Sequence, residues 1–68
     1  MSWNLEGLNV EATYLDEFKV SGKVQLSRVK YGGEVCHTIE LDSPIVVYGA
    51  VRERVIVDHK SVERVFSN

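Results

Sequence analysis

Between residues 18 and 27, apolar and polar residues alternate one by one along the chain. The even positions hold the apolar side chains and one glycine: Phe18, Val20, Gly22, Val24 and Leu26. Lysine, serine and glutamine fill the odd positions, including Ser27. A period of two places alternate side chains on opposite sides of an extended backbone. The segment therefore predicts a strand with one buried face and one face in water.

The composition agrees with a sheet. Valine is the commonest residue, and alanine occurs only at Ala12 and Ala50. Branched and aromatic side chains suit a pleated, half-buried surface better than a helix. With 68 residues and 44% hydrophobic residues, the chain is too apolar for a disordered tail and has room for one core. We therefore expect residues 1–68 to form one all-β domain.

Further strands are predicted over residues 8–14, 35–41, 45–48 and 51–57. Turns are expected at 15–17, at the adjacent glycines 32–33, at 42–44, where Pro44 should end a strand, and at 49–50. The inward faces should carry Val35, His37, Ile39 and Leu41 in the third strand, and Val51, Val55 and Val57 in the strand over residues 51–57. The phase of the alternation slips near Arg28, which indicates a β-bulge or a strand that bends between two sheets, and Gly22 suggests a sharp bend.

The last segment fits two structures. Val62, Val65 and Phe66 have helical spacing, so a short helix is one alternative. A 3₁₀ turn over residues 59–61 followed by a short strand over 63–66 is favoured, because β-branched residues dominate here as well.

Five or six short strands without a covering helix are expected to curl into a small antiparallel barrel, closed or partly open. The order of elements resembles an SH3-like barrel: a long second strand over residues 18–31, a hairpin at Gly32-Gly33, two more strands, and a turn at 58–61 before a closing strand. An OB-like barrel is the alternative fold. The aromatic groove with which signalling SH3 domains bind peptides is not recognisable, so proline-peptide binding does not follow from the resemblance. The sequence also resembles small proteins encoded by tailed phages.

Charge and cysteine content narrow the function classes. The net charge is −2 and the pI about 5.6, whereas a domain that holds nucleic acid is usually basic. The single cysteine, Cys36, forbids an intrachain disulfide, and with two histidines it leaves too few ligands for structural zinc. No signal peptide, membrane span, metal or cofactor is expected. The expected location is the cytoplasm, which is the host cytoplasm if a phage encodes the chain.

Catalytic chemistry would have to involve Cys36, His37 or His59. Neighbouring residues of a strand point to opposite faces, so Cys36 and His37 cannot act as a nucleophile and its base. The carboxylates stand at turns or at water-facing positions, where solvation is their expected role. We therefore predict that the protein is not an enzyme.

Two binding surfaces are predicted. Trp3, Tyr31, Val46 and Tyr48 form the preferred one, because exposed aromatic residues are enriched at protein contacts. The partner is a larger protein or a second copy of the chain, since small domains often gain stability by self-association.

The alternative surface is a basic strand that binds nucleic acid through Lys19, Lys23, Arg28 and Lys30, with Tyr31 stacking on a base.

Overall fold

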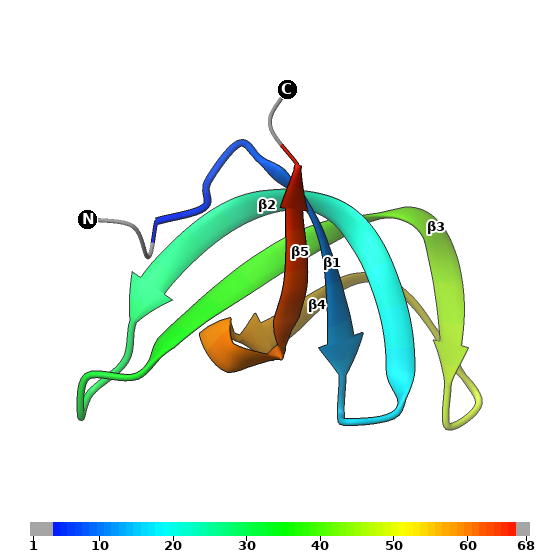
Figure 1. Ribbon diagram of the computed structural model, residues 1–68. Coiled ribbons are helices and arrows are strands. Elements are labelled where there is room, and N and C mark those ends of the chain that lie inside the picture. Colours follow the sequence, from blue (N-terminus) through cyan, green and yellow to red (C-terminus); the bar gives the residue numbers. More distant parts are fainter. Residues whose placement is uncertain (1–3, 67–68) are drawn as a thin grey trace.

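The computed structural model describes residues 4–66, which form a five-stranded antiparallel sheet (Figure 1). The elements are β1 (Asn9–Tyr14), β2 (Phe18–Val29), β3 (Val35–Val47), β4 (Ala50–Asp58), a 3₁₀ turn η1 (His59–Ser61) and β5 (Val62–Phe66). The order across the sheet is β4-β3-β2-β1-β5. The all-β prediction is confirmed, and so are the 3₁₀ turn and the short last strand.

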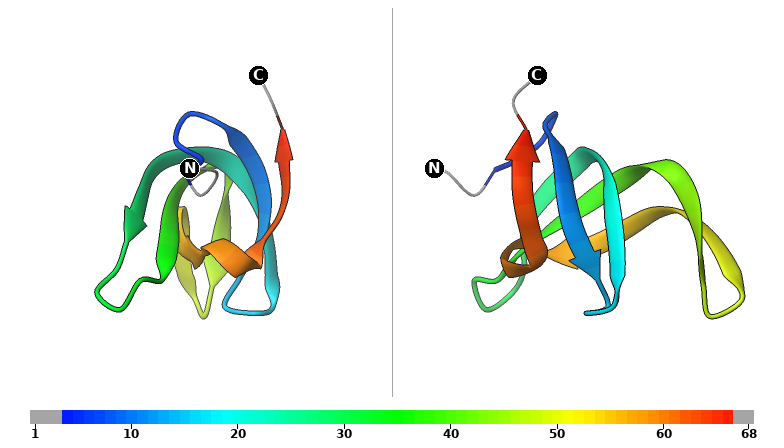
Figure 2. Two further views of the ribbon diagram at one scale, coloured as in Figure 1. Left: turned by 60° about the vertical axis from the view of Figure 1, so that its left-hand side comes forward. Right: turned by 45° about the vertical axis from the view of Figure 1, so that its right-hand side comes forward.

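The sheet curls around its own hydrophobic side (Figure 2). Residues of all of the first four strands and of the segment before β1 make up the core: Leu5, Val10, Ala12, Val20, Val24, Ile39, Val55 and Val57. The inward face predicted for β3 is confirmed, since His37 and Ile39 are fully buried and Leu41 packs against the core. Curling allows one sheet to bury a face without a covering helix.

The sheet does not close into a barrel, so the closed form of the predicted barrel is wrong. β4 and β5 are the two edges of the sheet and do not pair with each other. β5 pairs with β1 instead, after η1 has carried the chain across from the end of β4. A barrel requires every edge to be paired, so the structure is a strongly curved open sheet of five strands.

Gly22 lies where the backbones of β2 and β3 approach each other closely. A Cβ atom at this position would stand 2.1 Å from the Glu40 carbonyl oxygen, well inside van der Waals contact. Gly22 pairs with Val10 on one side and Leu41 on the other, so it is enclosed by two strands. The strand requires glycine here because the neighbouring backbone approaches too closely for a side chain.

The predicted bulge lies three residues earlier than expected. The register of β2 against β3 shifts between Val24 and Leu26, which leaves Gln25 as the extra residue. The bulge reverses the parity of the strand. Ser27 is therefore buried (7% exposed) and Leu26 faces outward (40% exposed), the opposite of the sequence prediction.

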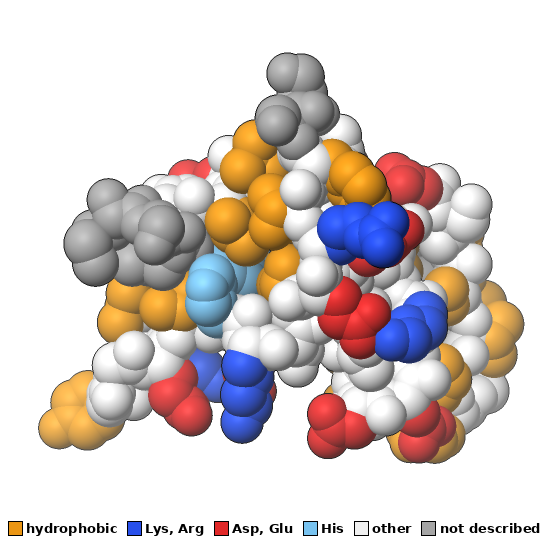
Figure 3. Space-filling model, in the orientation of Figure 1, with side chains coloured by type: hydrophobic (Ala, Val, Ile, Leu, Met, Phe, Trp, Pro, Cys, Tyr) orange, Lys and Arg blue, Asp and Glu red, His pale blue; other side chains and the backbone are white. Residues whose placement is uncertain are grey.

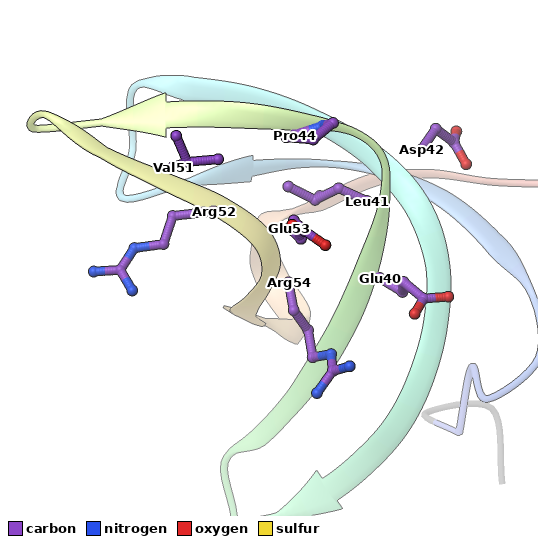
Figure 4. Close-up of a pocket in the computed structure, with 8 residues that line it drawn as sticks. All are labelled: Glu40, Leu41, Asp42, Pro44, Val51, Arg52, Glu53 and Arg54. Atoms are coloured by element: carbon purple, nitrogen blue, oxygen red, sulfur yellow. The ribbon is translucent and has the colours of Figure 1, made fainter.

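β3 does not end at Pro44 as predicted. The strand continues to Val47, and a large irregularity in the β3–β4 register between Glu40 and Ile45 accommodates the proline. The irregularity opens a hollow at the β4 edge (Figure 4). Val51 lines this hollow and is 66% exposed, so its predicted inward position is wrong, because the β3–β4 hairpin extends past the core.

Candidate functional site

Two hairpins end at the same side of the molecule (Figure 1). The β1–β2 loop displays Leu15, and the β3–β4 loop displays Tyr48; half of Leu15 and three quarters of Tyr48 are exposed. The Tyr48 ring packs edge-on against Phe18, with ring centroids 5.8 Å apart, and Phe18 contacts Tyr14. These ring contacts join the two loops into one surface.

The backbone at these tips is strained. Leu15, Asp16 and Tyr48 have positive φ angles of 53°, 59° and 50°. This left-handed conformation costs a residue other than glycine about 1–2 kcal/mol, and asparagine tolerates it best among the rest. Tyr48 and Gly49 form a two-residue loop with positive φ at both positions, a turn for which Asn-Gly is the preferred pair. The sequence places large apolar side chains where small or polar residues would strain the fold less.

Two valines continue the exposed apolar area along the β3–β4 hairpin. Val46 and Val51 pair across the ladder, and about two thirds of each is exposed. We call Leu15, Val46, Tyr48 and Val51 the hairpin-tip surface. Hydrophobic and acidic side chains gather where these two hairpins end, at the lower right of Figure 3.

Acidic residues flank this surface. Asp16 and Glu17 are exposed in the β1–β2 loop beside Tyr48. The negative charge of Glu17 raises the pKa of the Tyr48 phenol above its ordinary value, and burial and a hydrogen bond with Glu17 act in the same direction. The negative charge of the β1–β2 loop therefore acts on the phenol of Tyr48.

The predicted protein-binding residues are only partly brought together. Tyr48 and Val46 belong to the hairpin-tip surface, whereas Tyr31 is fully exposed in the β2–β3 loop at the opposite end of β3 (Figure 1). Trp3 lies outside the described residues. Leu15 was not among the predicted residues, because a leucine in a loop carries no signal until its φ angle is known.

The predicted basic strand is partly neutralised. Lys19 forms an ion pair with Glu63 at 2.6 Å, and Lys30 forms one with Asp58 at 3.5 Å. Within residues 4–66, Lys23 and Arg28 have no ion-pair partner. Arg28 lines a shallow hollow on the outer face together with Leu26, Thr38 and Ile56.

A second group of polar residues is buried beside the core. Ser27 Oγ accepts the Leu5 backbone N–H at 3.1 Å and lies 2.7 Å from His37 Nδ1. His37 Nε2 lies 2.8 Å from Nδ1 of His59. We call Ser27, His37 and His59 the histidine relay. Sequence reasoning placed Ser27 in water and found no reason to pair the two histidines, because their contact depends on the bulge and on η1.

The surroundings of His37 disfavour its charged form. Burial lowers the pKa of His37 below its ordinary value of 6.5, and the nearby His59 lowers it further. Burial removes water that would solvate an imidazolium, so the neutral ring is favoured.

Among residues 4–66, no three His, Cys, Asp or Glu side chains come together as metal ligands. No helix in the described part of the chain reaches the length and hydrophobicity that a membrane span requires. Comparison with family models, curated proteins and solved structures finds no match for the chain.

Proposed function

We propose that this chain is a non-enzymatic protein-interaction module that docks on a larger protein through the hairpin-tip surface. One observation carries the proposal: Leu15 and Tyr48 display large apolar side chains at left-handed backbone positions. Strained backbone conformations concentrate at ligand-binding sites, where the displayed group compensates for the conformational cost. Burial in a partner would supply that compensation.

The side chains of the hairpin-tip surface and of its rim indicate what kind of pocket the partner has. Tyr48 offers a large amphipathic ring, and Leu15 adds an aliphatic group beside it. Asp16 and Glu17 add negative charge at the rim. A complementary partner has an apolar pocket rimmed by lysine or arginine, because charge complementarity fixes orientation and speeds encounter. A second copy of the chain is less suitable, since its own tips would bring acidic loops together.

The burial of Ser27 and His37 supports a binding role rather than a catalytic one. The hydroxyl of Ser27 and both ring nitrogens of His37 are engaged within the protein. A nucleophile must be reachable by a substrate, and Ser27 and His37 are both buried.

Nucleic-acid binding through β2 is the alternative proposal. Lys23 and Arg28 both point to the outer face of the sheet. One is at an odd and the other at an even position, and they share a face because the bulge at Gln25 lies between them. The ion pairs of Lys19 and Lys30 reduce the positive charge available to phosphates. This alternative predicts binding of labelled single strands that falls steeply between about 50 and 200 mM salt.

The proposal also includes the kind of fold and the location in the cell. The order of elements, with a 3₁₀ turn before a short last strand, supports an SH3-like arrangement in an open form. The buried free thiol of Cys36 supports a cytoplasmic location, in a host cell if a phage encodes the chain.

The experiment compares capture of partners from the native cell by the wild-type chain, Tyr48→Asn and Tyr31→Asn. Tyr48→Asn removes the displayed ring and suits the turn, so the fold should keep its thermal midpoint within a few degrees. We expect one partner to bind the wild type and the Tyr31→Asn control, and to bind Tyr48→Asn at least tenfold more weakly when titrated as purified protein.

The proposal is wrong if Tyr48→Asn keeps full affinity for every captured partner. It is also wrong if the matched change at Tyr31, an exposed tyrosine at the other end of β3, removes binding instead.

A further inference from the structure

η1 has few attachments to the rest of the fold. None of its residues is buried, and its first residue, His59, reaches β3 through the hydrogen bond to His37. The two rings also pack together, with centroids 5.0 Å apart. Within residues 4–66, the contact between the histidines is the one side-chain hydrogen bond that joins η1 to the sheet.

β5 depends on the position of η1. Four of its five residues are exposed, and only Val62 is partly buried against the core. Elements with few buried side chains open more readily than the core. The histidine relay thus holds η1 in place, and β5 starts directly after η1.

Hydrogen bonding limits the protons that the relay can hold. With both rings neutral, one ring donates and the other accepts across the 2.8 Å contact between Nε2 of His37 and Nδ1 of His59. One added proton can be accommodated if His59 donates to His37 and the Nδ1–H of His37 donates to Ser27 Oγ. A second proton leaves N–H groups on both facing nitrogens, so neither can accept and two positive charges oppose each other.

Among the described residues, no charged side chain is hydrogen-bonded to the ring of His37, so none directly relieves the repulsion between two protonated rings. In the segment before β1, the Glu6 carboxylate accepts the backbone N–H of Ser27 at 2.9 Å. Around His59, the charged residues Glu34, Asp58 and Lys60 line a hollow with it, and Asp58 is paired with Lys30. On the other face of β3, Cys36 is the neighbouring titratable group, and Val57 faces His37 from β4. Within the described chain, the hydrogen-bonding partners of the His37 ring are Ser27 and His59.

We propose that the histidine relay is an acid-sensitive latch, whose second proton breaks the His37–His59 hydrogen bond and releases η1 and β5 from the sheet. At neutral pH the latch is closed and β5 covers the edge of β1. In acid, the latch opens and exposes the backbone N–H and C=O groups along that edge of β1. The lowered pKa of His37 is consistent with a ring held neutral by the closed latch.

The test is native-state amide hydrogen exchange, followed by NMR on the full chain between pH 7.5 and 4.5 and corrected for intrinsic exchange rates. In the wild type we expect the opening constants of β5 amides to rise at least tenfold towards pH 4.5, ahead of those of β2 and β3. Linkage allows about a tenfold change per pH unit for each proton taken up on opening.

Two variants separate the latch from general acid effects. His59→Gln keeps a side-chain oxygen that can accept from His37 but cannot titrate, so its β5 opening constants should change less than threefold over the same range. Lys60→Gln alters charge in the same turn without touching the relay, and it should behave like the wild type.

Three results would overturn the proposal: opening of β5 that does not depend on pH in the wild type, an unchanged pH profile in His59→Gln, or a Lys60→Gln profile flattened to the same degree. Ring ¹⁵N shifts provide a second readout that does not rely on a variant. At pH 7.5 the rings should show one donor and one acceptor at the facing nitrogens, and their titrations should be coupled; independent titrations would exclude the latch.

Discussion

At the scale of single residues, several side chains occupy positions that their residue type would not select. Leu15 and Tyr48 adopt left-handed backbone angles and still expose much of their apolar surface. Ser27 and His37 are polar and buried, but hydrogen bonds satisfy them. Departures of this kind from local preference concentrate at functional or strained sites.

Gly22 gives a residue-scale prediction that concerns stability only. Gly22→Ala should lower the free energy of unfolding by about 3 kcal/mol or more, because its methyl group would overlap the Glu40 carbonyl and force β2 and β3 apart. Urea denaturation measures the change.

Gly33→Ala is the matched control for Gly22→Ala. Gly33 has a φ angle of 93° and open space around its Cβ position, so only the backbone conformation opposes the change. The expected loss is about 1 kcal/mol, the cost of placing alanine in a left-handed conformation. Equal losses at the two glycines would contradict the close approach at Gly22.

At the scale of elements, the two edge strands differ in how they avoid pairing with other chains. β5 is short, and its exposed residues include Glu63 and Arg64. β4 is longer and presents exposed charges at its centre, Arg52, Glu53 and Arg54. Charged residues on an edge strand are a common protection against edge-to-edge association.

The charges of β4 oppose antiparallel pairing with a second copy. Two identical antiparallel strands related by a twofold axis place residues of the same face opposite each other, so centring the pair on Glu53 would set Arg52 against Arg54. Glu53 would face its own copy in this pair, but replacing both arginines by threonine removes the two arginine contacts and should favour strand pairing, because threonine suits a sheet. We expect concentration-dependent dimers of the double variant in light scattering after size exclusion.

The control replaces Lys23 and Arg28 by threonine, which removes the same charge from β2, a strand paired on both sides. This control should show no gain in mass over the wild type. Dimers that form equally in both double variants would indicate an effect of net charge rather than of the β4 edge.

At the scale of the whole molecule, one curved sheet provides the core, the hairpin-tip surface and the buried relay. The apolar side closes over Leu5 and the inward valines without forming a barrel. The loops at opposite ends of β3 carry Tyr31 and Tyr48, so these two exposed tyrosines lie on separate parts of the molecule. A small core of this kind leaves modest stability, on which one buried histidine has a measurable effect.

The pH dependence of global stability follows from His37. Its pKa in the folded state is lowered, so the unfolded chain binds more protons at acidic pH. The stabilisation from the neutral ring is complete above the ordinary value of 6.5 and declines as the pH falls below it. One proton permits a slope of at most about 1.4 kcal/mol per pH unit.

Urea midpoints should therefore stay constant between pH 7.5 and 8.5 and fall between pH 6.5 and 5.0. The slope of the unfolding free energy against urea concentration should not change. A midpoint that rises on acidification over the second range would show that the folded state stabilises the imidazolium, contrary to the burial of His37.

The alternation of residue types was enough to predict an antiparallel all-β chain, its main strands, the Gly32-Gly33 hairpin and the final 3₁₀ turn. These features depend on local propensity and on which side of the backbone each residue occupies, and both can be read along the chain. The inward positions of Ile39, Val55 and Val57 follow from the same rule and are confirmed.

Only the tertiary structure decided where the alternation breaks, whether the sheet closes and which distant residues meet. The bulge at Gln25 buries Ser27, β5 pairs with β1 instead of β4, and η1 places His59 on His37. Each outcome depends on the register between strands far apart in the sequence. Register is set by packing across the whole sheet, so residues read one segment at a time do not specify it.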